Sequence, residues 1–278
     1  MTDYRRGCIA MALLGALAIA GVAPRADAAK KRTKRAATTT KKAVTTTSTV
    51  PVTTTTLPPP FVQNFTAEGA LASLQSTGRN VSVNVVTLNA TAMISVSMNT
   101  ASLVEPEGRT SRVRVGSPTS LTDMVVSSGA FTLNGGTQTG ITCRESGGIE
   151  APYGFELLTS GATWILNQLS AGVRTPLASG PLPAAPAKGP QELVPSDGFE
   201  KAALKFTAAQ FIPLELSCRG AAGSPGQIVG KAFGEVVVTL PVGAMPGPGG
   251  AGFVLFSDRS AGSSTSKGVF GPITITAI

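Results

Sequence analysis

Histidine is absent from the 278-residue chain, and cysteine occurs only three times. Nucleophilic catalysis by a Ser-His or Cys-His pair is therefore excluded, and zinc sites lack most of their usual ligands. No Asp-rich calcium loop is present either, so we expect no metal and no other cofactor. Aromatic residues make up 5% of the chain, with one tryptophan and two tyrosines, so few side chains could form a flat platform for a ligand.

The net positive charge of the chain lies entirely at one end. Residues 1–60 carry ten Lys or Arg against two Asp, which gives +8, whereas residues 61–278 carry thirteen basic and thirteen acidic residues, which gives zero. A neutral body offers no basic stripe for a phosphate backbone, so we expect no nucleic-acid partner.

The first 28 residues have the organisation of a secretory signal peptide. Two arginines precede an apolar run from Cys8 to Ala23, and Ala26-Asp27-Ala28 supplies the small residues of a cleavage site. A retained membrane anchor is the alternative, but the run is shorter than the roughly 20 residues that span a bilayer. No later stretch is long and apolar enough to span one. We therefore expect a secreted or extracellular protein, possible association with the cell surface, and no transmembrane segment after cleavage.

Residues 29–60 form a linker that is basic in its first half and rich in Thr and Pro in its second. Its few large apolar residues could not offset the entropy lost on ordering, so the composition predicts disorder. Such a segment is either a solvated tail or a contact for an anionic polymer of the cell envelope, which salt would weaken.

Residues 61–278 have the pattern of a single all-β domain. Apolar and polar residues alternate in many short segments separated by Gly, Pro, Ser and Asn. The pattern predicts strands at Val81–Val85, Met93–Met98, Ser111–Val115, Ala130–Leu133, Ile141–Arg144, Tyr153–Leu158, Thr163–Leu166, Leu204–Thr207, Leu214–Cys218, Glu235–Leu240, Gly252–Ser257 and Val269–Ile275. Helical structure is expected only as short turns at 68–75 and 195–201. We expect an antiparallel sandwich, with the loop at 245–250 as an exposed tip.

Cys143 and Cys218 are the two cysteines that remain after the leader. In an oxidising compartment such a pair favours a disulfide, although two free buried thiols are the alternative. Strand alternation predicts that both sulfur atoms point inward and that the following residues, Arg144 and Arg219, point outward.

Several segments of the body resemble secreted bacterial domains of the concanavalin A-like lectin/glucanase superfamily, which includes laminin G-like jelly rolls. These segments are Gly140–Arg144, Tyr153–Leu157, Gly161–Leu166, Leu214–Gly220, Gly250–Ser257 and Gly268–Ile275. The resemblance covers about residues 61–278 and implies a jelly-roll sandwich of two antiparallel sheets, in which the curved face often carries the ligand site. The chain departs from the family pattern at the looser turn Gly223–Gly226 and at Gly271-Pro272.

An enzyme built on such a fold would need two carboxylates facing each other across a groove. No strand shows a closely spaced acid pair, and Glu145, Glu150 and Glu156 are interpreted as solvated turn or surface acids. Glu156 is the strongest catalytic candidate, because it lies between Phe155 and Leu157 on a predicted strand and so faces away from the core.

The preferred hypothesis is a non-catalytic binding domain that recognises a carbohydrate, with a glycan or protein of the cell envelope as partner. Tyr153 and Trp164 are the candidate aromatic platforms, although core packing is the competing interpretation for Trp164. Arg144 and Glu156 are candidate polar ligand contacts, and Arg174 and Arg219 could also clamp acidic sugars. The alternatives are a structural or protein-interaction module and a carboxylate-dependent glycoside hydrolase.

Overall fold

A computed structural model of the chain describes residues 57–66, 71–77, 81–88, 90–99, 109–115, 120–133, 137–149, 151–187, 191–195, 204–206, 210–257 and 265–278. The predicted leader and residues 29–56 of the predicted linker lie outside these ranges, as do Glu150 and residues 196–201 of the second expected helical turn. The described residues belong to one compact unit. They contain no helix that could cross a membrane.

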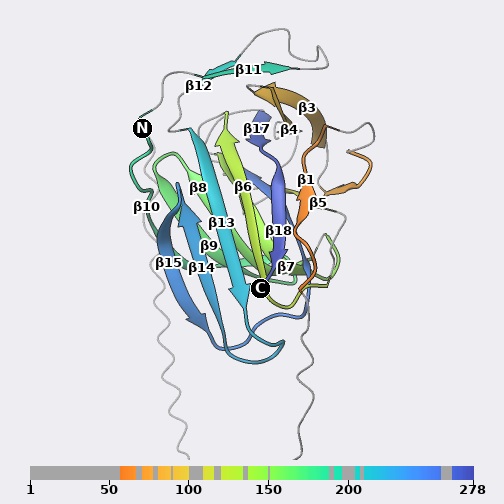
Figure 1. The fold of residues 1–278 in the computed structure, drawn as a ribbon, viewed down its shortest axis with the longest axis vertical. Coiled ribbons are helices and arrows are strands. Elements are labelled where there is room, and N and C mark those ends of the chain that lie inside the picture. Colours follow the sequence, from red (N-terminus) through yellow and green to blue (C-terminus); the bar gives the residue numbers. More distant parts are fainter. Residues whose placement is uncertain are drawn as a thin grey trace, which may run out of the picture. The chain divides into compact units, whose positions relative to one another are not determined.

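The described residues form eighteen strands in two sheets, and every pairing between these strands is antiparallel (Figure 1). The eleven-stranded sheet contains β1 (Phe61–Gln63), β3 (Val81–Leu88), β4 (Thr91–Asn99), β6 (Met124–Thr132), β11 (Gln191–Pro195), β12 (Leu204–Phe206), β13 (Phe211–Arg219), β14 (Gly226–Ala232), β15 (Glu235–Val242), β17 (Thr265–Phe270) and β18 (Ile273–Ala277). The seven-stranded sheet has the order β10 (Val173–Pro181), β9 (Thr163–Ser170), β8 (Tyr153–Ser160), β7 (Thr137–Ser146), β16 (Gly250–Ser257), β5 (Arg109–Val115) and β2 (Leu74–Thr77). This architecture confirms the predicted all-β, two-sheet jelly-roll sandwich.

The hydrophobic core lies between the two sheets. Phe253 of β16 packs against Phe270 of β17, with ring centroids 4.9 Å apart, and the ring centroids of Phe65 and Phe253 are 6.1 Å apart. From Met124 to Ala130 of β6, buried and half-buried residues alternate, as expected of a strand with one face on the core. In β8, by contrast, every residue from Gly154 to Thr159 is buried, so both faces of the seven-stranded sheet are covered at this point.

The disulfide between Cys143 and Cys218 is present and joins the two sheets. Cys143 lies on β7 and Cys218 on β13, their Cα atoms are 6.4 Å apart, and both residues are fully buried. The structure thus confirms the predicted pairing and the inward direction of both sulfur atoms.

Three local expectations are wrong. The strand expected at Val269–Ile275 is two strands, because the chain breaks at Gly271-Pro272, where proline has no N–H for the ladder. Leu74 and the residue after it, expected in a helical turn, begin β2 instead. The loop at 245–250 is no exposed tip, since Met245 is buried and exchanges backbone hydrogen bonds of 2.9 Å with Gly223 and Ser224.

Candidate functional site

The seven-stranded sheet turns one face to the core, and its opposite face, here called the outer face, carries a group of interacting polar side chains. We call this group the arginine–glutamate cluster. It consists of Arg112 and Arg114 on β5, Thr142 and Glu145 on β7, Glu156 on β8, Asn167 on β9 and Arg174 on β10. The strand register aligns Arg114, Gly252, Thr142, Glu156 and Asn167 in one row across five neighbouring strands.

Glu156 lies at the centre of the cluster and is fully buried. Its Oε1 accepts hydrogen bonds from Asn167 Nδ2 at 3.0 Å and from Arg174 Nε, and its Oε2 accepts from Arg112 Nη2 at 3.3 Å and Arg174 Nη2 at 3.2 Å. A carboxylate offers about four lone-pair positions, so these four contacts occupy its acceptor capacity. Glu156 does face away from the core, as predicted, but its interpretation as a solvated acid is wrong.

Arg174 shows how strongly the seven-stranded sheet is rolled. It lies on β10, yet its Nη1 is 3.4 Å from Thr110 Oγ1 on β5, and its guanidinium lies 4.4 Å from the ring centroid of Phe256 on β16. Five strand intervals separate β10 from β5. In a flat sheet they would span about 24 Å, far beyond the reach of these side chains. The two flanks of the outer face therefore curve toward each other and cover Glu156.

Two glycines allow this curvature. A Cβ atom on Gly140 of β7 would lie 2.0 Å from the carbonyl oxygen of Leu157, and one on Gly252 of β16 would lie 2.6 Å from the carbonyl oxygen of Val113. Backbones approach this closely only where no side chain intervenes. Gly252 is paired with Thr142, and Gly140 lies two residues before Thr142 on β7, so both glycines are on the outer face.

A β-bulge at Arg144 determines which side chains of β7 reach the cluster. The pairing with β16 skips Arg144, whose backbone adopts a positive φ of 53°. The extra residue shifts Glu145 onto the outer face, where Thr142 Oγ1 donates to its Oε2 at 2.7 Å. Arg114 donates to Glu145 Oε1 from Nε at 3.2 Å and from Nη2 at 3.1 Å. The expectation that Glu145 is a solvated turn residue is therefore wrong.

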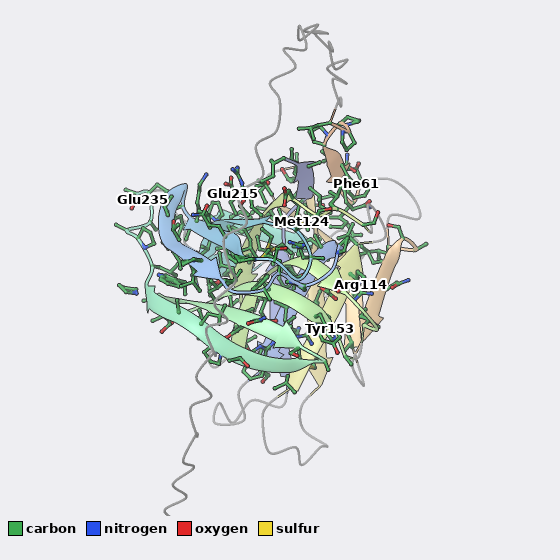
Figure 2. All side chains as sticks on the ribbon, turned by 90° about the horizontal axis from the view of Figure 1, so that it is seen from below. Phe61, Arg114, Met124, Tyr153, Glu215 and Glu235 are labelled. Carbon is green, nitrogen blue, oxygen red and sulfur yellow. A yellow bond between two sulfur atoms is a disulfide. The ribbon has the colours of Figure 1, made fainter. Side chains whose placement is uncertain are left out.

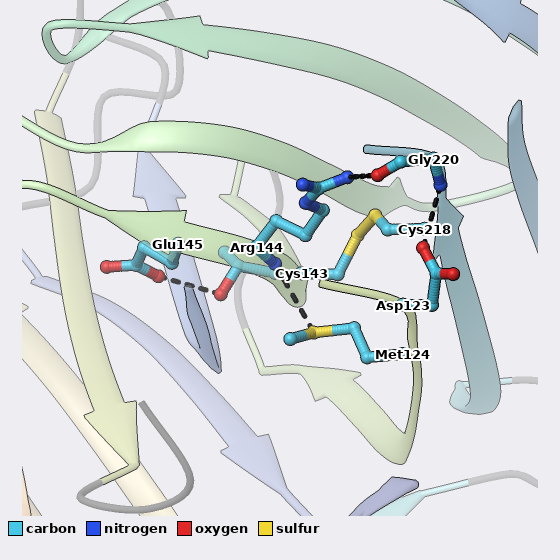
Figure 3. The surroundings of a disulfide bond; sticks show 8 residues. Asp123, Met124, Cys143, Arg144, Glu145, Cys218 and Gly220 are labelled. Carbon is cyan, nitrogen blue, oxygen red and sulfur yellow. Dashed lines mark hydrogen bonds between the residues drawn. A yellow bond between two sulfur atoms is a disulfide. The ribbon is translucent and has the colours of Figure 1, made fainter. Parts of the chain in front are cut away.

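The same bulge explains why the predicted outward orientation of Arg144 is wrong. Arg144 is fully buried, and Figure 3 shows its side chain extending toward Gly220 beside the disulfide. Its Nη1 donates to the Gly220 carbonyl at 2.6 Å, and its backbone N–H points to Met124 Sδ at 3.4 Å. Burial lowers the pKa of this guanidinium, and the negative charge of Asp123 acts in the opposite direction. Arg219, in contrast, is exposed as predicted.

The two candidate aromatic platforms lie in different environments. Tyr153 is exposed at the start of β8. Like Arg114 it belongs to the seven-stranded sheet, whereas Glu215 and Glu235 belong to the eleven-stranded sheet (Figure 2). Trp164 belongs to the hydrophobic core and packs against Gly180 of β10. Tyr153, Trp164, Arg144 and Glu156 therefore do not converge on one site.

The cluster is electrostatically unbalanced. Burial lowers the pKa of Arg112, and the positive charge of Arg174 lowers it further, while Glu156 and Glu145 act in the opposite direction. Arg112 Nε and Asn167 Oδ1 are both buried and have no hydrogen-bond partner among the described residues. The cluster thus retains hydrogen-bonding capacity that its own members do not use.

Chemically, the cluster combines planar guanidinium, carboxylate and amide groups with the ring of Phe256. Both carboxylates are already engaged by arginines, and the chain has no histidine that could replace them as acid or base. The arrangement is suited to holding a polar molecule by hydrogen bonds.

Sequence reasoning missed Arg112, Arg114, Asn167 and Phe256 as members of this site. Each lies on a strand at a position that alternation assigns to the outer face. This signal was available for Arg112, Arg114 and Phe256, whereas Asn167 lies one residue beyond the strand predicted at Thr163–Leu166. The order of the strands in the sheet brings β5 and β10 over β8, and the sequence pattern did not reveal this order.

No protein-family model and no curated protein sequence matches the chain. Solved structures with a similar arrangement include a Bacillus licheniformis β-glucanase, with 11% identity, a TM-score of 0.47 and coverage of 80% of this chain and 99% of that chain. They also include a β-1,3-1,4-glucanase from a mouse hindgut metagenome, with 12% identity, a TM-score of 0.48 and coverage of 79% and 99%. A third is the exoplasmic/lumenal domain of VIP36 in a Ca²⁺- and oligosaccharide-bound form, with 8% identity, a TM-score of 0.43 and coverage of 79% and 88%. At these values the similarities give no basis for assigning an activity.

Proposed function

We propose that the domain binds a carbohydrate on its outer face without cleaving it. The observation that carries this proposal is the state of Glu156, whose carboxylate accepts four hydrogen bonds from two arginines and an asparagine. A glycosidase needs one carboxyl group to protonate the leaving oxygen and another to act as base or nucleophile. Here Glu156 has no lone pair to spare, and Glu145 is held by Arg114 and Thr142.

Carbohydrate recognition fits the remaining groups of the cluster. Sugars are commonly held by planar polar side chains with an aromatic ring beneath one face of the sugar. Asn167, Arg174 and Phe256 supply these groups on the outer face of the seven-stranded sheet, where Asn167 is itself buried. We place this activity outside the reducing cytosol, a proposal supported by the Cys143–Cys218 disulfide.

A glycan array followed by an activity assay tests this function. The full-length protein should bind at least one class of glycan on the array. Incubation with the same glycans should release no new reducing ends. The Glu235→Gln variant, altered at an exposed site on the other sheet, serves as the control for both assays. Turnover that the Glu156→Gln variant abolishes would contradict the non-catalytic assignment, and an array without any bound glycan would contradict carbohydrate recognition.

A further inference from the structure

The arginine–glutamate cluster contains one more cation than anion. On the described strands of the seven-stranded sheet, the outer face carries the guanidinium groups of Arg112, Arg114 and Arg174 but only the carboxylates of Glu145 and Glu156. A buried charge is costly unless an opposite charge and hydrogen bonds compensate it. A third anionic group on the outer face would complete the pairing.

The geometry of the two guanidinium groups indicates which kind of anion fits. Arg112 is 7% exposed in its side chain, and its Nε has no hydrogen-bond partner among the described residues. Arg174 binds Glu156 through Nε and Nη2 together, which is the two-pronged geometry that guanidinium groups adopt with planar carboxylates. Arg112 and Arg174 approach the same carboxylate from opposite flanks of the sheet, so their donors converge on a small region.

Arg174 is also the group that a ligand would meet first. Its side chain is 18% exposed, compared with 7% for Arg112 and none for Glu156. The guanidinium lies over the ring of Phe256, which is itself half-buried. If Arg174 turns toward a ligand, the face of this ring becomes available for a sugar, while Arg112 and Asn167 still donate to Glu156.

We propose that the outer face selects saccharides that bear a carboxylate, that is, glycans containing uronic acids, and that Arg112 and Arg174 bind this carboxylate. This inference rests on the proposed carbohydrate-binding function and specifies its ligand class. The carboxylate of the saccharide balances the third guanidinium group, while the sugar ring stacks on Phe256.

Paired oligosaccharides test this specificity. Binding of the full-length protein to oligomers of galacturonic, glucuronic and mannuronic acid is measured by titration calorimetry, together with binding to their neutral methyl esters and to neutral hexose oligomers. At least one acid should bind about tenfold or more tightly than its own ester, because only the acid can pair with the guanidinium groups. Since the ester has the same sugar backbone, the difference reports on the charge.

Variants separate the cluster from the basic N-terminal segment, which could also attract anions. Arg174→Ala should lower the affinity for the acid about tenfold and leave that for the ester unchanged, whereas Arg219→Ala, at an exposed site on the other sheet, should change neither. Arg174→Lys keeps the charge without the two-pronged geometry and should give an intermediate affinity, and it replaces the alanine variant if circular dichroism shows that variant to be unfolded.

Each other result has a definite meaning. Equal affinity for acids and esters, or binding of neutral oligomers alone, overturns the acidic specificity while the carbohydrate-binding function stands. If both Arg174 variants still bind the acidic saccharide as tightly as the unaltered protein, the binding site lies in another part of the chain, which also overturns the inference. Binding of no saccharide overturns the proposed function itself.

Discussion

At the scale of single residues, Glu156 has the most unusual environment among the described side chains of the outer face. It is a fully buried carboxylate whose charge is compensated by Arg112 and Arg174. A buried pair of this kind contributes little net stability compared with a well-packed apolar group, because both charges have left water. Removing one partner is a different matter, since the other charges then stay buried without compensation.

The Glu156→Gln substitution should therefore destabilise the protein by about 3–5 kcal/mol, because it leaves two guanidinium groups without their carboxylate. Urea unfolding followed by circular dichroism measures this change. The matched control is Glu215→Gln, which breaks a half-exposed ion pair of 2.7 Å with Lys231. There the loss should stay below about 1 kcal/mol, because solvent screens the pair. Equal losses at the two sites would show that Glu156 is not compensated by its arginines.

The fate of individual side chains shows what alternation alone can predict. It places Cys143, Cys218 and Arg219 correctly and assigns Glu156 to the face away from the core. It fails for Arg144, because one extra residue in β7 reverses the order of faces after that point. A bulge depends on how two strands pair, and a single strand sequence does not contain this information.

At the scale of elements, the roll of the seven-stranded sheet is the feature that creates the site. Gly140 and Gly252 permit neighbouring backbones to approach where the sheet bends. Edge strand β10, which the alternating pattern did not predict, supplies Arg174. Its prolines, Pro176 and Pro181, hide the strand pattern but are tolerated at a sheet edge.

The Gly140→Ala substitution tests this close approach. The added methyl group would meet the backbone carbonyl of Leu157, which cannot move without disturbing β8, so we expect a loss of about 1–3 kcal/mol or more. Gly148→Ala is the control, since a Cβ atom there meets no heavy atom within 4 Å and the change should stay within about 0.5 kcal/mol. Thermal and urea unfolding of both variants give the comparison. A wild-type stability for Gly140→Ala would mean that the sheet does not bend at this residue.

At the scale of the whole molecule, the two sheets are joined covalently near one end by Cys143 and Cys218. The bond closes a loop across 75 positions of the chain, and it crosses the core. The sequence could predict the two-sheet sandwich and this link, because alternation and cysteine count are properties of the chain itself. The pairing partners of each strand depend on contacts between distant segments, and the sequence pattern did not reveal them.

Loss of the disulfide should lower the free energy of unfolding by about 4 kcal/mol, because the unfolded chain regains the freedom of the open loop. The comparison is between the protein before and after reduction, with the Cys143→Ala/Cys218→Ala double variant as a control that reduction should not affect. Thiol titration of the denatured protein gives a second readout, in which reduction should expose two additional sulfhydryl groups. If reduction exposes none, the two cysteines are not linked.

The pairing of β1 with β18 has a mechanical consequence. Phe61–Gln63 is the first paired segment of the described chain, and only three residue pairs hold it to the C-terminal strand. If the preceding segment anchors the domain while a ligand holds the opposite sheet, tension enters the fold through this short ladder. The three pairs between β1 and β18 would break before the two sheets, which the Cys143–Cys218 disulfide joins, could separate. The domain could therefore extend under tension without losing its core.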